Sequence, residues 1–290
     1  MKKKLCVAIP VGGVVHNDYL EHNLKLLKKT DAYICIGIDE KESLLTPMTG
    51  GEYGKTKQLC KEYADQVIEF PEESYYRPGG IWKKLYDCWK ASGATYVRGL
   101  GYDDFLPPDL VEGHLAFIEH HANLDASYCD YLIQDDTQGS RHFFSTKLSK
   151  YKKVKNTGGN PFSFICWLIK FSAINTAEFE HKLLKASAGF EYFLHAVLFT
   201  TKCAHFPGSP SLSAVRREHQ KTVSQLHQDG VIQEKESIIK EIRALTGYSE
   251  EQTMKDWRSL DFPALCRTLR KQQSRPYALI ANWRKKNNSQ

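Results

Sequence analysis

Two adjacent aspartates, Asp103 and Asp104, stand in the stretch LGYDDFLPPD, which spans residues 100–109. Two prolines follow and stiffen the chain. Adjacent carboxylates are hard oxygen ligands that suit Mg²⁺ or Mn²⁺, and such an ion would neutralise the charge on a departing diphosphate. The other interpretation is an ordinary helix start, with Asp109 as the N-cap and the aspartate pair exposed to water. This stretch alone does not decide between the two.

The hydrophobic pattern places the aspartate pair at the end of a strand. As far as residue 133, the chain alternates apolar runs, typical of strands buried on both faces, with stretches of helical periodicity. This alternation predicts an α/β fold with a mostly parallel, Rossmann-like sheet and helices on both faces. Ligands of such sheets bind beyond the carboxyl ends of the strands, where Asp39 also stands. The predicted strands are 5–10, 32–39, 66–70, 95–100 and 126–133, and the predicted helices are 17–29, 53–64, 81–92 and one that begins at 109.

Beyond residue 133 the pattern changes. A long polar and basic connection leads to an apolar run at 162–174, which predicts a strand followed by a turn, and 189–202 predicts a short buried helix. The rest of the chain shows amphipathic helical patterns with polar spacers. We therefore divide the chain into a main domain, 1–224, and a helical C-terminal extension, 225–290.

The composition is that of a soluble globular protein of 290 residues, with 41% apolar and 26% charged residues. The net charge of +6 suits partners with phosphates or anionic surfaces without requiring them. None of the eight cysteines is spaced CxxC, which argues against a disulfide framework or a zinc knuckle and for a reducing, cytoplasmic location. No motif for nucleic-acid recognition is present. The basic end at 283–286 either packs on the main domain or contacts an anionic membrane.

Several segments, in order along the chain, resemble the inverting glycosyltransferases of the GT-A fold, the large family 2. ASGATYVRGLGYDDFLPPDLVEGHL resembles that family's central acidic motif. VAIPV and YICIGIDE resemble its first two strands, and GGIWKKLYDCW resembles the helix before the metal-binding strand. FSFICWLIKFSAI, GFEYFLHAV and SAVRREHQKTVS resemble a later strand, the helix with the catalytic base and a late basic motif. The resemblance covers residues 5–224.

The resemblance implies roles for residues near the ends of the first four strands. Asp103 matches the metal-binding acid of the motif, and Asp104 matches the acid that often follows it. The motif's first acid falls on Gly101 and is therefore missing, which puts metal binding in question. Asp39 matches the acid that contacts the nucleobase or ribose, and Pro10 falls in the nucleotide-sugar-binding first strand.

Three residues of the C-terminal half also match the family. Glu191 falls on the position of the catalytic base, where it would deprotonate the acceptor hydroxyl; the alternative is a solvent-facing helix residue. Arg217 matches an arginine that would face the diphosphate, and His219 a histidine that would complete the metal shell; the alternative is a solvated charge cluster. Asp135 and Asp136 form a second acidic pair outside any family motif, and we rank them below the first pair as metal ligands.

The resemblance therefore implies a glycosyltransferase of glycan biosynthesis. It would move a sugar, with inversion, from a nucleotide sugar (UDP is the expected nucleotide) to a hydroxyl of a glycan or lipid-linked acceptor, with Mn²⁺ or Mg²⁺ as cofactor. Two alternatives stay open. A degenerate member would bind a nucleotide or glycan without transfer, which Gly101 favours. A nucleotidyltransferase on a similar scaffold would need a basic residue to hold triphosphate, and the loop VGGVVHNDY lacks one.

Overall fold

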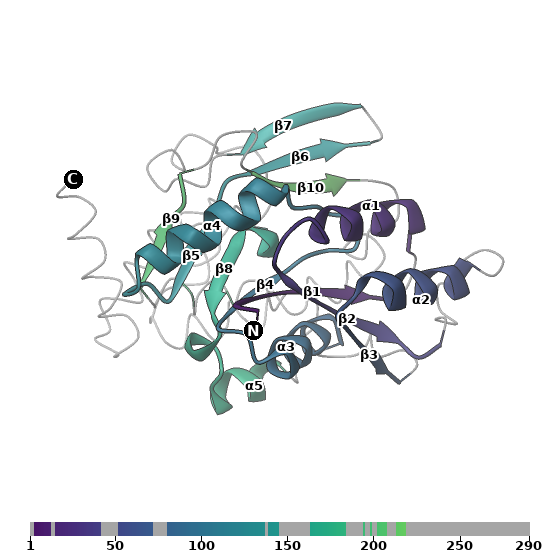
Figure 1. Cartoon of the computed structure of the whole chain (residues 1–290), viewed down its shortest axis with the longest axis horizontal. Helices are drawn as coiled ribbons and strands as arrows, with labels where there is room; N and C mark the ends of the chain where they lie inside the picture. Colours follow the sequence, from purple (N-terminus) through teal and green to yellow (C-terminus); the bar gives the residue numbers. More distant parts are fainter. Residues whose placement is uncertain are drawn as a thin grey trace, which may run out of the picture.

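A computed structural model shows the predicted alternation of strands and helices (Figure 1). The residues it describes are 3–12, 15–41, 52–71, 80–136, 139–144, 163–183, 194, 198, 202–207 and 213–218. The strands are β1 (Leu5–Val11), β2 (Tyr33–Asp39), β3 (Gln66–Phe70), β4 (Tyr96–Gly99), β5 (Ala126–Tyr128), β6 (Tyr131–Asp135), β7 (Ser140–Phe144), β8 (Trp167–Lys170), β9 (Cys203–His205) and β10 (Ala214–Glu218). The helices are α1 (Asn17–Leu27), α2 (Glu52–Tyr63), α3 (Gly80–Ser92), α4 (Pro108–His120) and α5 (Ala177–Leu183), with 3₁₀ turns at Phe164–Cys166 and Phe171–Ala173.

The main sheet has the strand order β3-β2-β1-β4-β8-β5-β9. Its first four strands are parallel, β5 is parallel to β9, and β8 is antiparallel to both of its neighbours. Consequently β5 and β9 run in the same direction as β1. The carboxyl ends of all these strands except β8 therefore lie along one edge, which we call the carboxyl edge. The predicted mostly parallel α/β sheet is confirmed.

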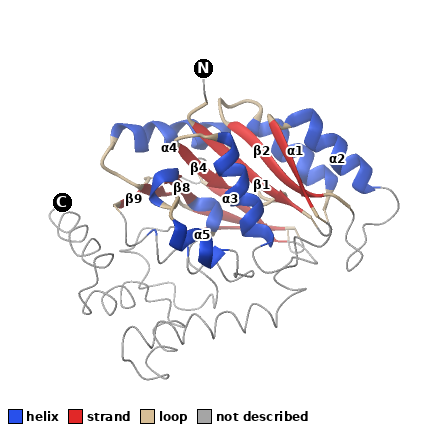
Figure 2. Cartoon of the chain, turned by 90° about the horizontal axis from the view of Figure 1, so that it is seen from below, coloured by secondary structure: helices blue, strands red, loops and turns tan. Residues whose placement is uncertain are grey.

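The sheet separates two apolar layers. On one face, leucines of α1 at positions 20, 24 and 27 pack with α2, α4 and alternate residues of β1 and β2. On the other face, α3 and α5 pack against the remaining side chains of these strands, and Trp82 and Trp89 of α3 are buried there. Figure 2 shows α3 and α5 on one side of the strands and the other three helices on the opposite side. Because both faces are covered, the central strands β1 and β2 are almost entirely apolar.

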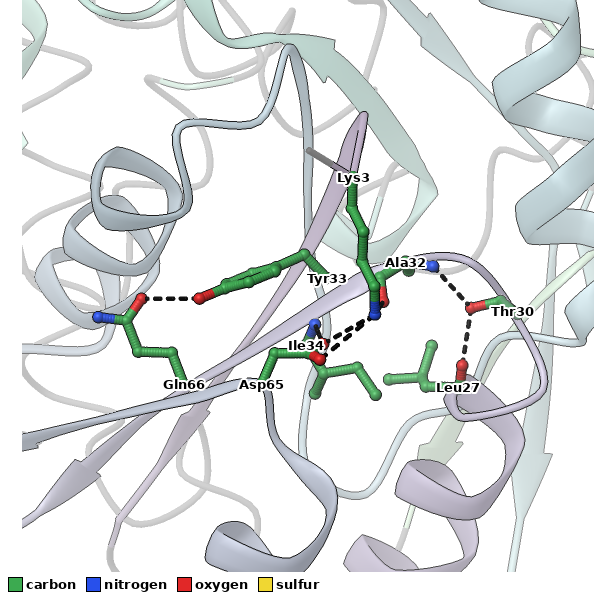
Figure 3. Close-up of polar contacts among 8 residues, drawn as sticks. All are labelled: Lys3, Leu27, Thr30, Ala32, Tyr33, Ile34, Asp65 and Gln66. Atoms are coloured by element: carbon green, nitrogen blue, oxygen red, sulfur yellow. Dashed lines mark hydrogen bonds and ion pairs between the residues drawn. The ribbon is translucent and has the colours of Figure 1, made fainter. Parts of the chain in front are cut away.

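Polar contacts set the register at the opposite, amino edge of the sheet (Figure 3). The carboxylate of Asp65, just before β3, accepts a hydrogen bond of 2.8 Å from the backbone N–H of Ile34 in β2. Lys3 pairs with the same carboxylate at 3.2 Å and also donates to the carbonyl of Ala32. These contacts tie β1, β2 and β3 together at their starts, away from the edge where ligands of such sheets bind.

A smaller sheet, with the order β10-β6-β7, lies beside α1 and α4 (Figure 1). Our prediction of one strand over 126–133 was wrong, because β5 ends at Tyr128 and β6 begins at Tyr131 in the other sheet. The change of sheet occurs at Asp130, a buried carboxylate among apolar neighbours. An apolar run cannot reveal that its two halves pair with different strands.

Several predicted features lie outside the described residues, among them Glu191, His219, most of the predicted 189–202 helix and the extension 225–290. Over the part of the chain that the structure describes, no helix is both long and apolar enough to cross a membrane. The cysteines described there, at 6, 35, 60, 88, 129, 166 and 203, are all buried free thiols, in line with the argument against a disulfide framework.

Candidate functional site

The aspartate pair lies in a short turn at the carboxyl edge, between β4 and α4. The backbone N–H of Asp104 donates to the carbonyl of Gly101 at 3.3 Å, which closes the turn. A Cβ at position 101 would lie 2.7 Å from Oδ2 of Asp104 and 2.8 Å from Oδ1 of Asp103. Both carboxylates therefore turn toward Gly101 and occupy the space that a side chain there would need. The glycine makes room for an acid pair that converges on one point.

The late basic motif lies directly beside this acidic turn. Phe105 and Val215 of β10 exchange backbone hydrogen bonds of 3.0 and 2.9 Å. Arg217 is two residues further along β10, so its backbone lies close to the turn, although its side chain is outside the description. From the other side, the ring of His22 in α1 packs edge-on against Phe105. The structure thus brings together two predicted motifs that are far apart in the sequence.

Asp39 ends β2 at the same edge, where it forms a buried ion pair that the sequence did not reveal. Nζ of Lys84 in α3 lies 2.6 Å from Oδ1 of Asp39, and both side chains are 1% exposed or less. Burial lowers the pKa of Lys84, while the charge and hydrogen bond of Asp39 oppose that shift. Tyr53 donates to the Asp39 carbonyl. Gly37 makes room for the lysine stem, since a Cβ there would lie 2.7 Å from Cβ of Lys84.

A buried polar network joins the elements on either side of the acidic turn. Arg98 in β4 donates to the carbonyl of Ile165 at 2.9 Å from Nε and 2.6 Å from Nη2. Its Nη1 donates to Nδ1 of His114 in α4 at 3.2 Å, and Nη2 donates to Sγ of Cys129 at 3.2 Å. Because Nδ1 of His114 accepts, its Nε2 carries the proton and donates to the hydroxyl of Ser127 at 2.7 Å.

Burial and neighbouring groups together shift the pKa values of the titratable side chains in this network. Burial lowers the pKa of His114 below its ordinary value of 6.5, so the imidazole is neutral. Burial alone would raise the pKa of the Cys129 thiol, but its hydrogen bond with Cys166 and the Arg98 cation oppose that effect and lower the pKa below its ordinary value. A lowered pKa favours the thiolate, and a thiolate at Cys129 would be the negative partner that a guanidinium in such an interior requires.

These buried polar residues were missed by the sequence reasoning. Arg98 interrupts the apolar strand TYVRGL, and Lys84 lies on the apolar side of its helix; a charge inside an apolar pattern was the available signal. A histidine outside any motif is most often predicted at the surface or at a helix end, and this interpretation of the sequence is wrong for His114, which is fully buried. Its neighbour in space, Phe206, stacks on the ring at 4.8 Å.

The predicted site residues fall into three groups. Asp39, Asp103 and Asp104 lie at the carboxyl edge, the position predicted for them, and Pro10 lies near the end of β1; their roles in binding stay predictions. The backbone of Arg217 lies in the same region, beside the acidic turn. Glu191 and His219 lie outside the described residues. Of the second acidic pair, Asp136 accepts from the hydroxyl of Tyr19 at 2.8 Å and from Gln134 at 2.8 Å.

The acidic turn suits a cation only in company with other oxygen or nitrogen ligands. Within the described ranges, no cluster of three or more His, Cys, Asp or Glu side chains is placed to hold a metal ion. Two convergent carboxylates nevertheless match the way Mg²⁺ is usually held, by one or two carboxylates together with substrate phosphates. The donor set therefore fits a divalent ion that arrives with a phosphorylated ligand.

The fold is the GT-A fold of nucleotide-sugar glycosyltransferases. It is similar to S. aureus TarS 1-349 in complex with UDP-GlcNAc, with a TM-score of 0.54 and 11% identity over 95% of this chain and 73% of that one. It is also similar to the mannosyltransferase PcManGT from Pyrobaculum calidifontis in complex with GDP-Man and Mn²⁺, with a TM-score of 0.51 and 10% identity over 97% and 79%. No protein-family model matches the sequence, and comparison with curated proteins finds no match. The predicted GT-A architecture is confirmed.

Proposed function

We propose that this protein is a glycosyltransferase that takes a sugar from a nucleotide-sugar donor. The observation that carries the proposal is the acidic turn, which places two convergent carboxylates at the carboxyl edge of a GT-A sheet. Ligands of open α/β sheets bind at this edge. The solved structures of similar fold hold UDP-GlcNAc, UDP, or GDP-Man with Mn²⁺, which supports the same class of donor here.

In this proposal the donor lies along the carboxyl edge. Asp39, at the end of β2 and near Pro10, contacts the nucleobase or ribose of the donor. UDP is the expected nucleotide. Asp103, with Asp104 beside it, holds a divalent ion, Mn²⁺ or Mg²⁺, that neutralises charge on the leaving diphosphate. The resemblance implies that the Arg217 side chain would face the same phosphates and that His219 would complete the metal shell.

The reaction would be a direct displacement with inversion at the anomeric carbon. The acceptor, a hydroxyl of a glycan or a lipid-linked sugar, loses its proton to a basic side chain as it attacks. The resemblance nominates Glu191 for that role, in the segment GFEYFLHAV. A contact between the basic C-terminal end and a membrane, where a lipid-linked acceptor would lie, stays part of the proposal.

Calorimetry with UDP and GDP, each with Mn²⁺ and with EDTA, tests the donor site. We expect one nucleotide to bind, with an affinity about tenfold higher when Mn²⁺ is present. D103N and D104N should abolish the Mn²⁺ effect because each removes a charged ligand. The matched control is D109N, because Asp109 is an exposed aspartate in the first turn of α4.

The alternatives give different results in the same experiment. A protein that binds nucleotide with Mn²⁺ but releases no sugar from any donor would be the degenerate, non-catalytic member that Gly101 favours. A preference for UTP or another triphosphate over the diphosphates would favour a nucleotidyltransferase. The absence of any nucleotide binding would exclude the proposed function.

A further inference from the structure

A histidine and an aspartate form a pair at the carboxyl edge that the proposed mechanism has not used. Nε2 of His205, the last residue of β9, lies 2.9 Å from Oδ1 of Asp130, which follows β5. The imidazole ring also contacts the ring of Tyr128 at 5.5 Å. β5 and β9 are parallel and end in register at Tyr128 and His205, so the pair stands on the same edge as Asp39.

The pair has the arrangement of an oriented proton acceptor. A carboxylate only accepts hydrogen bonds, so in neutral His205 the proton is on Nε2 and the lone pair is on Nδ1. In the part of the chain that the structure describes, His205 makes no other hydrogen bond. Its side chain is 17% exposed, whereas that of Asp130 is 4% exposed. The buried carboxylate therefore fixes the tautomer of an imidazole that still reaches solvent, the arrangement by which an acid orients a histidine base.

The start of β10 links this pair to the acidic turn. The carbonyl of Asp130 accepts a hydrogen bond of 3.1 Å from the N–H of Ala214, and the next residue, Val215, pairs with Phe105 of the turn. Ala214 and Val215, which are adjacent in β10, therefore contact Asp130 and the acidic turn respectively. A donor that runs from Asp39 to a diphosphate at the turn continues in the direction of β5 and β9, so its sugar would lie toward the pair.

We propose that Nδ1 of His205 accepts the proton of the attacking hydroxyl, with Asp130 as the positioning residue. The inference rests on the proposed glycosyltransferase function and assigns to His205 the role that the resemblance gives to Glu191. As the O–H bond breaks, the proton moves to Nδ1 and the oxygen bonds to the anomeric carbon. The bond from that carbon to the diphosphate breaks, and the nucleoside diphosphate leaves with the electron pair. Histidine is the side chain that most often performs such transfers.

The titratable groups around His205 define what a variant would disturb. Asp130 and Tyr128 contact the imidazole directly, and its charge also influences the buried His114. H205Q keeps a hydrogen-bonding side chain of similar size. D130N keeps the shape of its partner but offers an amide N–H to Nε2, which moves the histidine proton to Nδ1 and removes the accepting lone pair.

The test measures release of UDP or GDP from UDP-GlcNAc and GDP-mannose, with water as the acceptor. For H205Q and for D130N we expect kcat to fall about 100-fold, while the donor KM and the affinity for free nucleotide stay within about twofold. E191Q should lose less than about tenfold. H120Q is the control, since His120 is exposed at the end of α4, near the amino edge.

Each failure has its own signature. Wild-type protein that releases no sugar from either donor would overturn the proposed function, and this inference with it. If the wild type is active and H205Q matches it, the inference alone is wrong. A larger loss in E191Q than in H205Q would return the role to Glu191. Equal loss of nucleotide affinity and kcat in H205Q would show a structural role and would also overturn the inference.

Discussion

The guanidinium of Arg98 and the sulfur of Cys129 form a contact of 3.2 Å in the interior, between β4 and the end of β5. Arg98 is always charged, and the other groups it contacts, a backbone carbonyl and a neutral imidazole, carry no charge. The lowered pKa of the Cys129 thiol favours its thiolate, which we expect to be the compensating anion. Arg98 lies in β4, the strand that leads into the acidic turn.

C129A should therefore be more harmful than a typical loss of a buried thiol. It leaves the guanidinium buried without an anion, and breaking a buried pair from one side costs about 3 kcal/mol or more. C88A is the matched control, since Cys88 is equally buried but burial raises the pKa of its thiol, so it carries no charge. Urea unfolding of both variants measures the difference. Equal losses would mean that Cys129 is a neutral thiol.

The Lys84–Asp39 pair should behave as a coupled unit. K84M leaves the Asp39 carboxylate buried without its cation, and we expect it to lose about 3 kcal/mol of the free energy of unfolding. In the double variant K84M/D39N the charge is gone, so part of that stability should return. A double-mutant cycle that uses D39N as the second single variant gives the coupling energy. Additive losses would show that the two side chains do not depend on each other.

The free energy of unfolding should decrease in mild acid because His114 has a lowered pKa in the folded state. Its pKa is lower in the folded state than the 6.5 of the unfolded chain, so below about pH 6.5 the unfolded state binds more protons. The contribution is present above that pH and is lost as the pH falls through 6.5 toward the lower folded value. H114Q cannot take up a proton, so its unfolding free energy should depend less on pH than that of the wild type. Parallel curves between pH 8 and pH 5 would contradict this.

Position 101 should not tolerate a side chain. In G101A the Cβ would meet carboxylate oxygens at 2.7 and 2.8 Å, so the aspartates must move apart. We expect G101A to lose about 1–3 kcal/mol of stability and to weaken the Mn²⁺ effect on nucleotide binding. Restoring the family's acid in G101D should not strengthen metal binding, for the same reason. G113A in α4 is the control, because the nearest side chain there is an ordinary 3.5 Å away and alanine favours the helix. Tighter Mn²⁺ binding by G101D would refute the steric account.

The sequence by itself determined the class of fold and the edge of the sheet at which the candidate site residues stand. Apolar runs alternating with helical patterns are set by local periodicity, and parallel strands must place Asp39 and the aspartate pair at one edge. The glycine in the acidic motif was also visible. The sequence did not show why a glycine is needed there, because the space next to residue 101 is filled by the Asp103 and Asp104 side chains, whose rotamers depend on the turn.

Only the tertiary structure decided which distant residues meet. The pairing of Phe105 with Val215, the ion pair of Lys84 with Asp39 and the contact of His205 with Asp130 each join residues more than 40 positions apart in sequence. No local pattern encodes such partners, because they depend on strand order and on the switch of the chain between two sheets at Asp130. Burial then lowers the pKa of His114, and the Arg98 cation lowers that of Cys129; burial and contacts of this kind are properties of the packed fold and not of the sequence position.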